Sequence, residues 1–319
     1  AITVDNEKDA QTEILSKSAR VLLVAGTATW DYRILQTLLF RDKTINVSCW
    51  LQSMDIDMMQ EGKTPINKLP ENEKELFEYD VVILLDPNPS EIDEKWFEML
   101  QKFIEERKGG LMYIAGPNYT TKTFGMLGGQ KLKELMPVHF TKQQREHKDF
   151  MKVTFETQWL FHLTVEGQSH YIGKLNNDNN INREIWKNLP GIYWSYPIGE
   201  AKAGSKILIE HTDPKLIYKE KNRPLFVTGV FGGGRTIYMG FNGIWRWRKN
   251  SDKYFDKFWI QSIRYLNEGK LEKDSGKSNL YTNKEKYIVG ETISISAKIY
   301  DDFGEGLKLE KLTGKIFKG

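Results

Sequence analysis

The stretch RVLLVAG at residues 20–26 decides the fold that the sequence predicts. An apolar run of this kind, ending in glycine, is typical of a β-strand buried on both faces of a parallel sheet. Three similar runs follow it, INVSCWL at 45–51, VVILLD at 81–86 and LMYIA at 111–115. We therefore expect four buried strands in one sheet.

Helical patterns separate these strands. Thr27 or Thr29 can cap the helix that follows the first strand, and Ser90 is expected to cap a long helix that runs through Lys108. Alternating strands and helices imply right-handed crossovers between parallel strands. The predicted fold class is therefore α/β, a flavodoxin-like or Rossmann-like, mostly parallel sheet.

The pattern weakens after the fourth strand. Short strands are expected at 152–156, 192–198 and 205–211, around a polar loop NNDNNINREIW at 176–186. Residues 157–185 show no clear period and are long for a loop in a compact domain. We interpret this stretch as an inserted antiparallel region that lies over the edge of the sheet.

The segment PLFVTGVFGGGRTIYMGFNGIWRWR, residues 224–248, predicts a hairpin followed by a cluster of Trp and Arg. Three glycines between two apolar runs permit the positive φ that a tight reversal needs. These glycines do not match a phosphate loop, since they join two strands and lack the GxxxxGK[ST] pattern. A helix is expected from Asp252 to Leu266, and the Trp/Arg cluster is interpreted chiefly as a clamp on it. Stacking of indole on guanidinium, or sugar binding by an exposed indole, is the alternative.

Both ends of the chain differ from its centre. Residues 1–18 are a polar lead-in, and 269–279 (GKLEKDSGKSN) are interpreted as a linker. The alternating stretch TISISAKIY at 292–300 predicts β-strands. We expect an α/β domain over 19–268 and the truncated start of an immunoglobulin-like β-sandwich over 280–319.

Composition bounds the class of protein. The chain has 319 residues, a formal net charge of +3 and a single cysteine, Cys49. The charge balance and the lack of a basic run with interleaved aromatics argue against nucleic acid as a partner. One cysteine excludes an internal disulfide and a cysteine-based metal cluster. No apolar run is long enough to span a membrane, and the first residues carry neither an initiator Met nor a signal peptide. We interpret the chain as a soluble piece of a longer protein whose anchors lie outside it.

Several of these stretches resemble one family. The unit RVLLVAGTATWDYRILQTLLFRDKTINVSCWLQS, the closing motif GGGRTIYMGFNGIWRWR with YFDKFWIQSIRYL, and the pieces LTVEGQSH and IWKNLPGIYW carry the resemblance. They are similar to the glutamine-amidotransferase-like domain of large bacterial membrane proteins, which often also carry von Willebrand factor A-type regions. The resemblance covers about residues 19–268. The family's name implies the fold of class I amidotransferases and does not imply their activity.

The chemistry of those enzymes needs groups that this chain lacks at the matching positions. They use a Cys on the turn after the fourth strand and a His after a late strand. Here that turn is AGPN at 115–118, and the late strand leads to Asn242, which cannot act as a base. Cys49 lies inside the second predicted strand and is expected to be a small buried hydrophobe. The resemblance therefore implies a non-catalytic relative, with no catalytic residues to assign.

Polar residues at the carboxyl edge of the sheet form the candidate cleft, because ligands of open α/β folds bind there. The candidate residues are Asp31, Arg33, Asp86, Asn118, Asn242 and Arg246, with Trp30 and Tyr32 beside them. Two interpretations stay open. The cleft could hold a small molecule, a peptide or a glycan, or its Asp and Asn residues could serve the backbone of turns and helix ends.

His162, Glu166 and His170 stand at intervals of four residues. On an extended strand the two histidines would lie roughly 26 Å apart, too far for one metal ion. We expect a turn in which one His is hydrogen-bonded locally, and we predict neither a metal site nor a cofactor.

The predicted function is recognition by a non-catalytic module of a membrane-anchored envelope protein. Its expected partners are proteins of the cell envelope, or else a small ligand or glycan, at an extracytoplasmic location. The alternatives are a hydrolase or amidotransferase-like enzyme that uses Asp31 and Asp86, and a carbohydrate-binding module that uses exposed Trp. A nucleophile in contact with a base in the cleft would favour the first alternative.

Overall fold

The computed structural model describes most of the chain between residues 18 and 298. The described residues are 18–55, 57–125, 129–140, 158–196, 198–214, 217–275, 279–282 and 295–298. The predicted strand at 152–156 and nearly all of the lead-in at 1–18 lie outside them.

Five parallel strands form one side of an eight-stranded sheet, from the β2 edge to β10. They are β1 (Ala19–Ala25), β2 (Ile45–Leu51), β3 (Val81–Leu85), β4 (Gly110–Ile114) and β10 (Gly234–Met239). The order β2-β1-β3-β4-β10 is flavodoxin-like, and the strand order reverses between the neighbouring strands β1 and β3. This part of the predicted fold class is confirmed.

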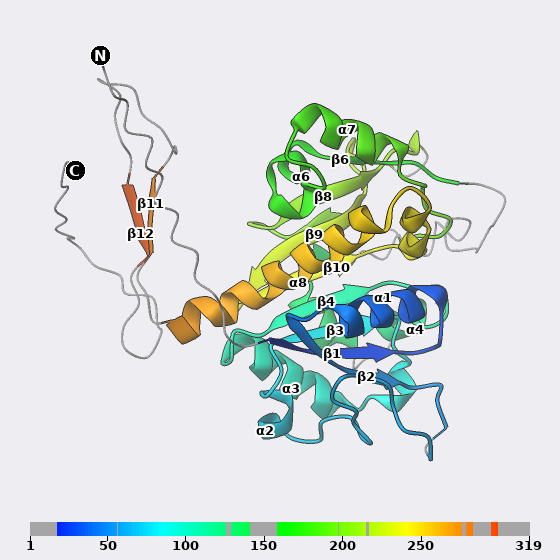
Figure 1. Cartoon of the computed structure of the whole chain (residues 1–319), viewed down its shortest axis with the longest axis vertical. Helices are drawn as coiled ribbons and strands as arrows, with labels where there is room; N and C mark the ends of the chain where they lie inside the picture. Colours follow the sequence, from blue (N-terminus) through cyan, green and yellow to red (C-terminus); the bar gives the residue numbers. More distant parts are fainter. Residues whose placement is uncertain are drawn as a thin grey trace.

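Helices cover both faces of the sheet (Figure 1). Helices α1 (Trp30–Arg41) and α8 (Asp252–Ser275) lie on one face, and α2 (Glu73–Leu76) and α3 (Glu94–Glu105) lie on the other. Alternate residues of β1 therefore serve two cores. Leu23 packs in the cluster that includes residues of α1 and α8, while Leu22 packs in the cluster that includes residues of α3. Burial on both faces explains why β1 is apolar throughout.

The helix starts are partly as predicted. Thr29 caps α1, accepting a hydrogen bond from the Tyr32 amide. The prediction that Ser90 caps the next long helix is wrong. Asp93 caps α3 by accepting a 2.8 Å hydrogen bond from the Trp96 amide. Ser90 lies in a preceding 3-10 turn, Pro89–Glu91, because Pro89 fixes that turn first.

The predicted glycine hairpin is present. Strand β9 (Pro224–Phe231) runs antiparallel to β10, and Gly232 and Gly233 have φ of +54° and +93°. These values suit glycine because a side chain would be strained at both positions. The turn also packs tightly, since a Cβ on Gly232 would lie 2.5 Å from Glu105.

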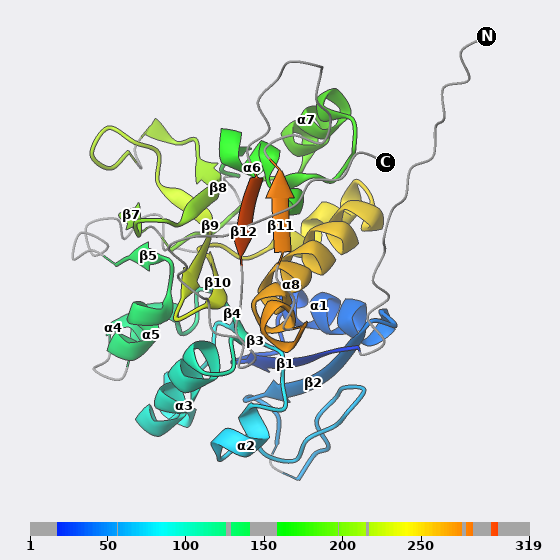
Figure 2. The same ribbon diagram turned by 90° about the vertical axis from the view of Figure 1, so that its left-hand side faces the viewer.

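An antiparallel extension completes the sheet. Strand β8 (Lys206–His211) pairs with β9, and β6 (Phe161–Leu163) pairs with β8 at the sheet edge. Short helices α4 (Thr120–Gly125) and α5 (Gly129–Leu135) and a two-stranded sheet of β5 (Val138–His139) and β7 (Glu200–Ala201) lie beyond β4. The inserted antiparallel region is thus confirmed where the structure describes it. Figure 2 shows this extension beside the parallel part of the sheet.

Two predictions inside this region are wrong. The polar stretch 176–186 is not a loop, because it forms most of α7 (Asn179–Asn188), which Asp178 caps. The described residues of 192–198, which leave out position 197, show isolated bridges at Ile192 and Ser195 in place of the predicted strand. Residues 165–173 form α6 (Val165–Ser169) and a 3-10 turn (Tyr171–Gly173).

The final helix is longer than predicted. It continues past Leu266 to Ser275, so the first part of the stretch predicted as a linker, 269–279, is helical. Lys270 explains this, because its ammonium group is buried and pairs with the Asp80 carboxylate at the start of β3. Beyond the helix, β11 (Asn279–Thr282) and β12 (Ile295–Lys298) form an antiparallel pair. The immunoglobulin-like sandwich and the division at 268 stay predictions.

Candidate functional site

The carboxyl ends of β1, β3 and β10 bring most of the candidate cleft residues to one edge of the sheet. Trp30 and Asp31 follow β1, Asp86 follows β3, and Asn242 follows β10. This is the edge where open α/β sheets bind ligands, at the change of strand order. The side chains divide into two groups, one around Asp86 and one around Asp31.

Asp86 holds the turn after β4. Its carboxylate accepts hydrogen bonds from the backbone amides of Asn118 (2.9 Å), Tyr119 (3.1 Å) and Thr120 (2.7 Å), and from the Thr120 hydroxyl (2.8 Å). Only 5% of Asp86 is exposed. Burial raises its pKa, and these hydrogen bonds oppose the rise. A Cβ on Gly116 would lie 2.5 Å from this carboxylate, so glycine is required there.

The contact between Thr120 and Asp86 places a hydroxyl beside a carboxylate, as a nucleophile and its base would be. Its environment does not suit catalysis. Thr120 is fully buried, and its oxygen also accepts a hydrogen bond from the Gly116 amide and lies 3.1 Å from the Tyr113 hydroxyl. A substrate cannot reach this oxygen in the described conformation.

Asp31 holds the turn after β10. It accepts hydrogen bonds from the backbone amides of Gly243 (2.9 Å) and Trp245 (3.4 Å), and it is 9% exposed. Burial raises its pKa, opposed by these amides and by the positive charge of Arg246. Both aspartates therefore serve turns, as the second interpretation of the cleft predicts.

The Trp/Arg cluster has two different faces. Trp247 is fully buried, with its ring 5.2 Å from Phe258 of α8 and 5.5 Å from Trp186, and its indole donates to the Pro190 carbonyl. The predicted clamp on the final helix is confirmed for this residue. The alternative of stacked indoles and guanidiniums holds for Arg246 on Trp245, whereas Trp247 is buried in the core.

Trp245 and Arg246 line an open groove. The Arg246 guanidinium lies 4.5 Å from the centre of the Trp245 ring and 4.6 Å from that of Tyr193. The groove has a volume of about 750 Å³ and is also lined by Arg248, Lys249 and Asp252. Three cationic side chains face one carboxylate, and that carboxylate pairs with Arg248 at 2.6 Å. A ligand with negative charge suits this lining.

The other predicted residues are not among those that line the groove. Arg33 is exposed on α1, and Asn242 is half-buried in the turn that Asp31 holds. The Asn118 side chain donates to the Thr27 hydroxyl at 3.1 Å. Tyr32 is buried in the core and is not among the residues that line the groove, which differs from the expectation for it.

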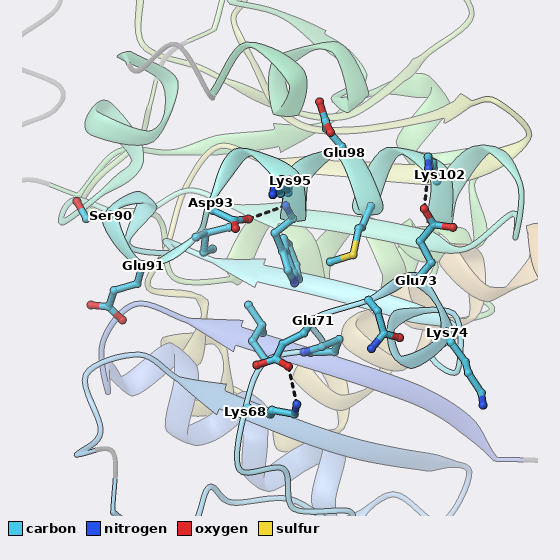
Figure 3. Close-up of a pocket in the computed structure, with 16 residues that line it drawn as sticks. Lys68, Glu71, Glu73, Lys74, Ser90, Glu91, Asp93, Lys95, Glu98 and Lys102 are labelled. Atoms are coloured by element: carbon cyan, nitrogen blue, oxygen red, sulfur yellow. Dashed lines mark hydrogen bonds and ion pairs between the residues drawn. The ribbon is translucent and has the colours of Figure 1, made fainter.

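A larger cavity lies on the other side of the molecule, between α3 and residues 68–74 (Figure 3). Its volume is about 1060 Å³. Lys68 pairs with Glu71 of the same segment at 2.5 Å, and Lys102 of α3 pairs with Glu73 on the opposite side at 2.6 Å. It contains none of the predicted cleft residues, and its charges largely neutralise one another.

The residues weighed for metal or nucleophilic chemistry have local roles. His170 accepts a hydrogen bond from the Ile172 amide at its Nδ1, as expected, while His162 lies 3.5 Å from Glu210. No cluster of metal-ligating side chains occurs among the described residues. Cys49 is buried, and burial raises the pKa of its thiol to about 12.

Solved structures of other proteins are similar to this chain in fold, at low sequence identity. A cytoplasmic protein from Salmonella typhimurium matches 77% of this chain and 98% of its own, with 13% identity and a TM-score of 0.50. Another cytoplasmic protein from Salmonella typhimurium LT2 has 14% identity and a TM-score of 0.47. A protein from Bacteroides uniformis described as ThuA-like has 12% identity and a TM-score of 0.44.

No family model matches the chain. No curated protein matches it either. The structural likeness supports the predicted α/β fold and says nothing of activity at these identities. The membrane-protein context and the association with von Willebrand factor A-type regions stay predictions. None of the described helices combines the length and apolar character needed to cross a membrane.

Of the residues that line the groove, only Arg246 belongs to the predicted cleft set, and Tyr193 and Lys249 are among those that the sequence does not indicate. Tyr193, which stacks on Arg246, comes from the piece IWKNLPGIYW more than fifty residues earlier in the chain. Lys249 lines the groove at the end of the 3-10 turn Ile244–Lys249. The proline and glycine before Tyr193 mark a turn, but sequence alone does not indicate what that turn faces.

Proposed function

We propose that this chain is a non-catalytic recognition module that binds an acidic segment of a partner protein in the groove beside Trp245 and Arg246. One observation carries the proposal. The carboxylates at the sheet edge, Asp31 and Asp86, are engaged by backbone amides, whereas the Arg246 guanidinium faces the groove.

The arrangement of Arg246 suits recognition of carboxylates. Its guanidinium lies close to two aromatic rings, and among the described residues a single hydrogen bond, to the Gly243 carbonyl at 3.4 Å, ties it to the turn. Stacking fixes the plane of the fork while its N–H groups stay free to pair in two-pronged fashion with a carboxylate. Arg248 and Lys249 add positive charge that attracts an acidic segment over a range of roughly 8–10 Å in physiological salt.

Fluorescence anisotropy with a labelled oligoglutamate peptide tests the proposal. We expect saturable binding that Arg246→Ala weakens about tenfold or more, because one charge-assisted contact contributes about 1.5–3 kcal/mol. Arg33→Ala is the matched control, since Arg33 is an exposed arginine outside the groove. Equal loss in both variants would mean that the peptide responds to net charge and not to the groove.

Carbohydrate binding is the second candidate. Trp30 is 61% exposed, and its ring lies 5.8 Å from that of Trp245 at an interplanar angle of 35°. Two neighbouring indoles offer an apolar platform for the face of a sugar. A neutral oligosaccharide that quenches Trp fluorescence in the native protein, and not in Trp30→Ala, would support this candidate over the acidic segment.

The extracytoplasmic location and membrane anchoring through segments outside this chain belong to the same proposal. Support for this location comes from the resemblance to a domain of large bacterial membrane proteins. Fractionation of cells that carry the full reading frame, with this domain detected in the envelope or in the cytosol, tests the location separately from binding.

A further inference from the structure

A second cavity lies at the opposite end of β10 from the groove. It has a volume of about 460 Å³ and lies between the antiparallel extension and α8. Strand β9 supplies Thr228 and Gly229 to its wall, while α6 and the turn after it supply Glu166 and His170. The motif HLTVEGQSH, which the metal interpretation leaves unexplained, thus contributes to a cavity.

His170 presents one hydrogen-bond donor to this cavity. Its ring stacks on Tyr171 at 4.9 Å and meets Tyr265 edge-on at 5.4 Å, so its orientation is fixed. Because Nδ1 accepts a hydrogen bond from the Ile172 amide, the proton of the neutral ring sits on Nε2. Within the described part of the chain, that Nε2–H has no hydrogen-bond partner.

Two cations share the cavity. Lys206 at the start of β8 is exposed, and no ion-pair partner for it occurs among the residues that the structure describes. Arg235 lies over the Tyr265 ring at 4.9 Å and pairs with Glu268 at 3.1 Å, which neutralises part of its charge. Tyr171 also donates to Glu268 at 2.5 Å, so that carboxylate is already engaged.

The field at His170 is positive. Burial lowers the pKa of His170 to about 4, and Lys206 and Arg235 add to the effect. The remaining titratable groups that line the cavity are the exposed Glu166 and the two tyrosines, Tyr171 and Tyr265. An ammonium, a guanidinium and a neutral N–H donor in a cavity of this size match the oxygens of a small anion.

We infer that this cavity binds the oxyanion group of a small molecule, either a phosphate or a carboxylate, with Lys206 as the principal ion-pair partner and His170 as a hydrogen-bond donor. This site lies at the amino end of β10, whereas the groove lies beyond the carboxyl end. The inference therefore stands independently of the proposed recognition of an acidic segment.

Nuclear magnetic resonance of the His170 ring tests the inference in the whole chain. We expect inorganic phosphate or acetate, titrated to millimolar concentrations, to shift the His170 Cε1–H resonance saturably and to raise the pKa of His170. Chloride at matched ionic strength should leave the resonance unchanged. Saturation by phosphate alone or by acetate alone identifies which source of the oxyanion the cavity prefers.

Two variants separate the site from net charge. Lys206→Met should weaken the apparent affinity at least fivefold, whereas Lys174→Met, an exposed lysine outside the cavity, should leave it unchanged. Since both side chains are exposed, both variants should fold. The absence of a saturable shift with either anion, or an equal loss in the two variants, would overturn the inference.

Discussion

Replacing Asp86 by alanine removes the carboxylate that holds the turn after β4. Three backbone amides and one hydroxyl, at 2.7–3.1 Å in the native protein, would lose their acceptor. The site is buried, so water cannot readily replace all four contacts. The perturbation therefore leaves hydrogen-bond donors unsatisfied in the interior, which is among the few mechanisms that strongly destabilise a protein.

The magnitude follows from two contributions. A hydrogen bond to a charged group contributes about 1.5–3 kcal/mol, but four bonds to one carboxylate are not additive, so we expect about 3 kcal/mol from the lost acceptor. Asp86 also has a φ of +41°, where alanine costs about 1 kcal/mol more than a residue suited to that conformation. We therefore expect the free energy of unfolding of the variant to be about 4 kcal/mol lower than that of the native protein.

Urea denaturation followed by Trp fluorescence measures this loss. Asp93→Ala provides an intermediate case, because that cap makes one 2.8 Å hydrogen bond and should contribute about 1 kcal/mol. Asp57→Ala, at an exposed position, should change stability by less than about 0.5 kcal/mol. If Asp86→Ala unfolds within 1 kcal/mol of the native protein, the structural role assigned to this carboxylate is refuted.

Three further outcomes follow from buried groups. Trp247→Ala should destabilise the chain by about 3–5 kcal/mol, against less than about 1 kcal/mol for Trp245→Ala, in the same urea assay. Lys270→Ala should cost about 3 kcal/mol, because it leaves the largely covered Asp80 carboxylate, 14% exposed, without its ammonium partner; equal stability of Lys270→Ala and native protein would contradict the pairing. Burial lowers the pKa of His211 to about 4 from its ordinary value of 6.5, so stability present above pH 6.5 is lost as the pH falls towards 4, by up to about 3 kcal/mol. His211→Asn keeps an acceptor for the Asp213 amide and should reduce that pH dependence to the part that His170, whose pKa is also lowered to about 4, contributes; an unchanged profile would show that His211 does not cause it.

The parallel sheet could be predicted from the sequence because a strand that is buried on both faces appears as a nearly continuous run of apolar residues. Strands β1 to β4 are apolar at nearly every position, and the glycines between β9 and β10 mark their reversal. These features are local. They need no knowledge of which other segment lies nearby.

The errors occur where polar residues have structural roles. Helix α7 was predicted as a loop because its sequence is rich in Asn, yet the buried Asn182 accepts from the Leu175 amide and donates to the Gly173 carbonyl. Lys270 likewise lies in a charged stretch that resembles a linker, although its partner Asp80 is 190 residues away. Composition indicates solvent exposure in both cases, and only the tertiary contacts show otherwise.

The candidate cleft shows the same limit. The sequence places Asp31 and Asp86 at the right edge of the sheet, since each follows a buried strand. It cannot show that Asp31 accepts from the Gly243 amide, 212 residues later in the chain. That contact decides whether the carboxylate is available for chemistry. The separation of Trp245 from Trp247 also depends on the 3-10 turn that carries them, which the sequence did not predict.

The proposal that the groove beside Trp245 and Arg246 binds an acidic segment is tested most directly by titrating the whole chain with the oligoglutamate peptide. The titration is followed at the Trp indole N–H resonances. We expect the Trp245 resonance to shift saturably, while that of Trp247, buried against α8, stays in place. A saturable shift that spares Trp245, or its persistence in Arg246→Ala, would contradict the assignment of the groove as the binding site.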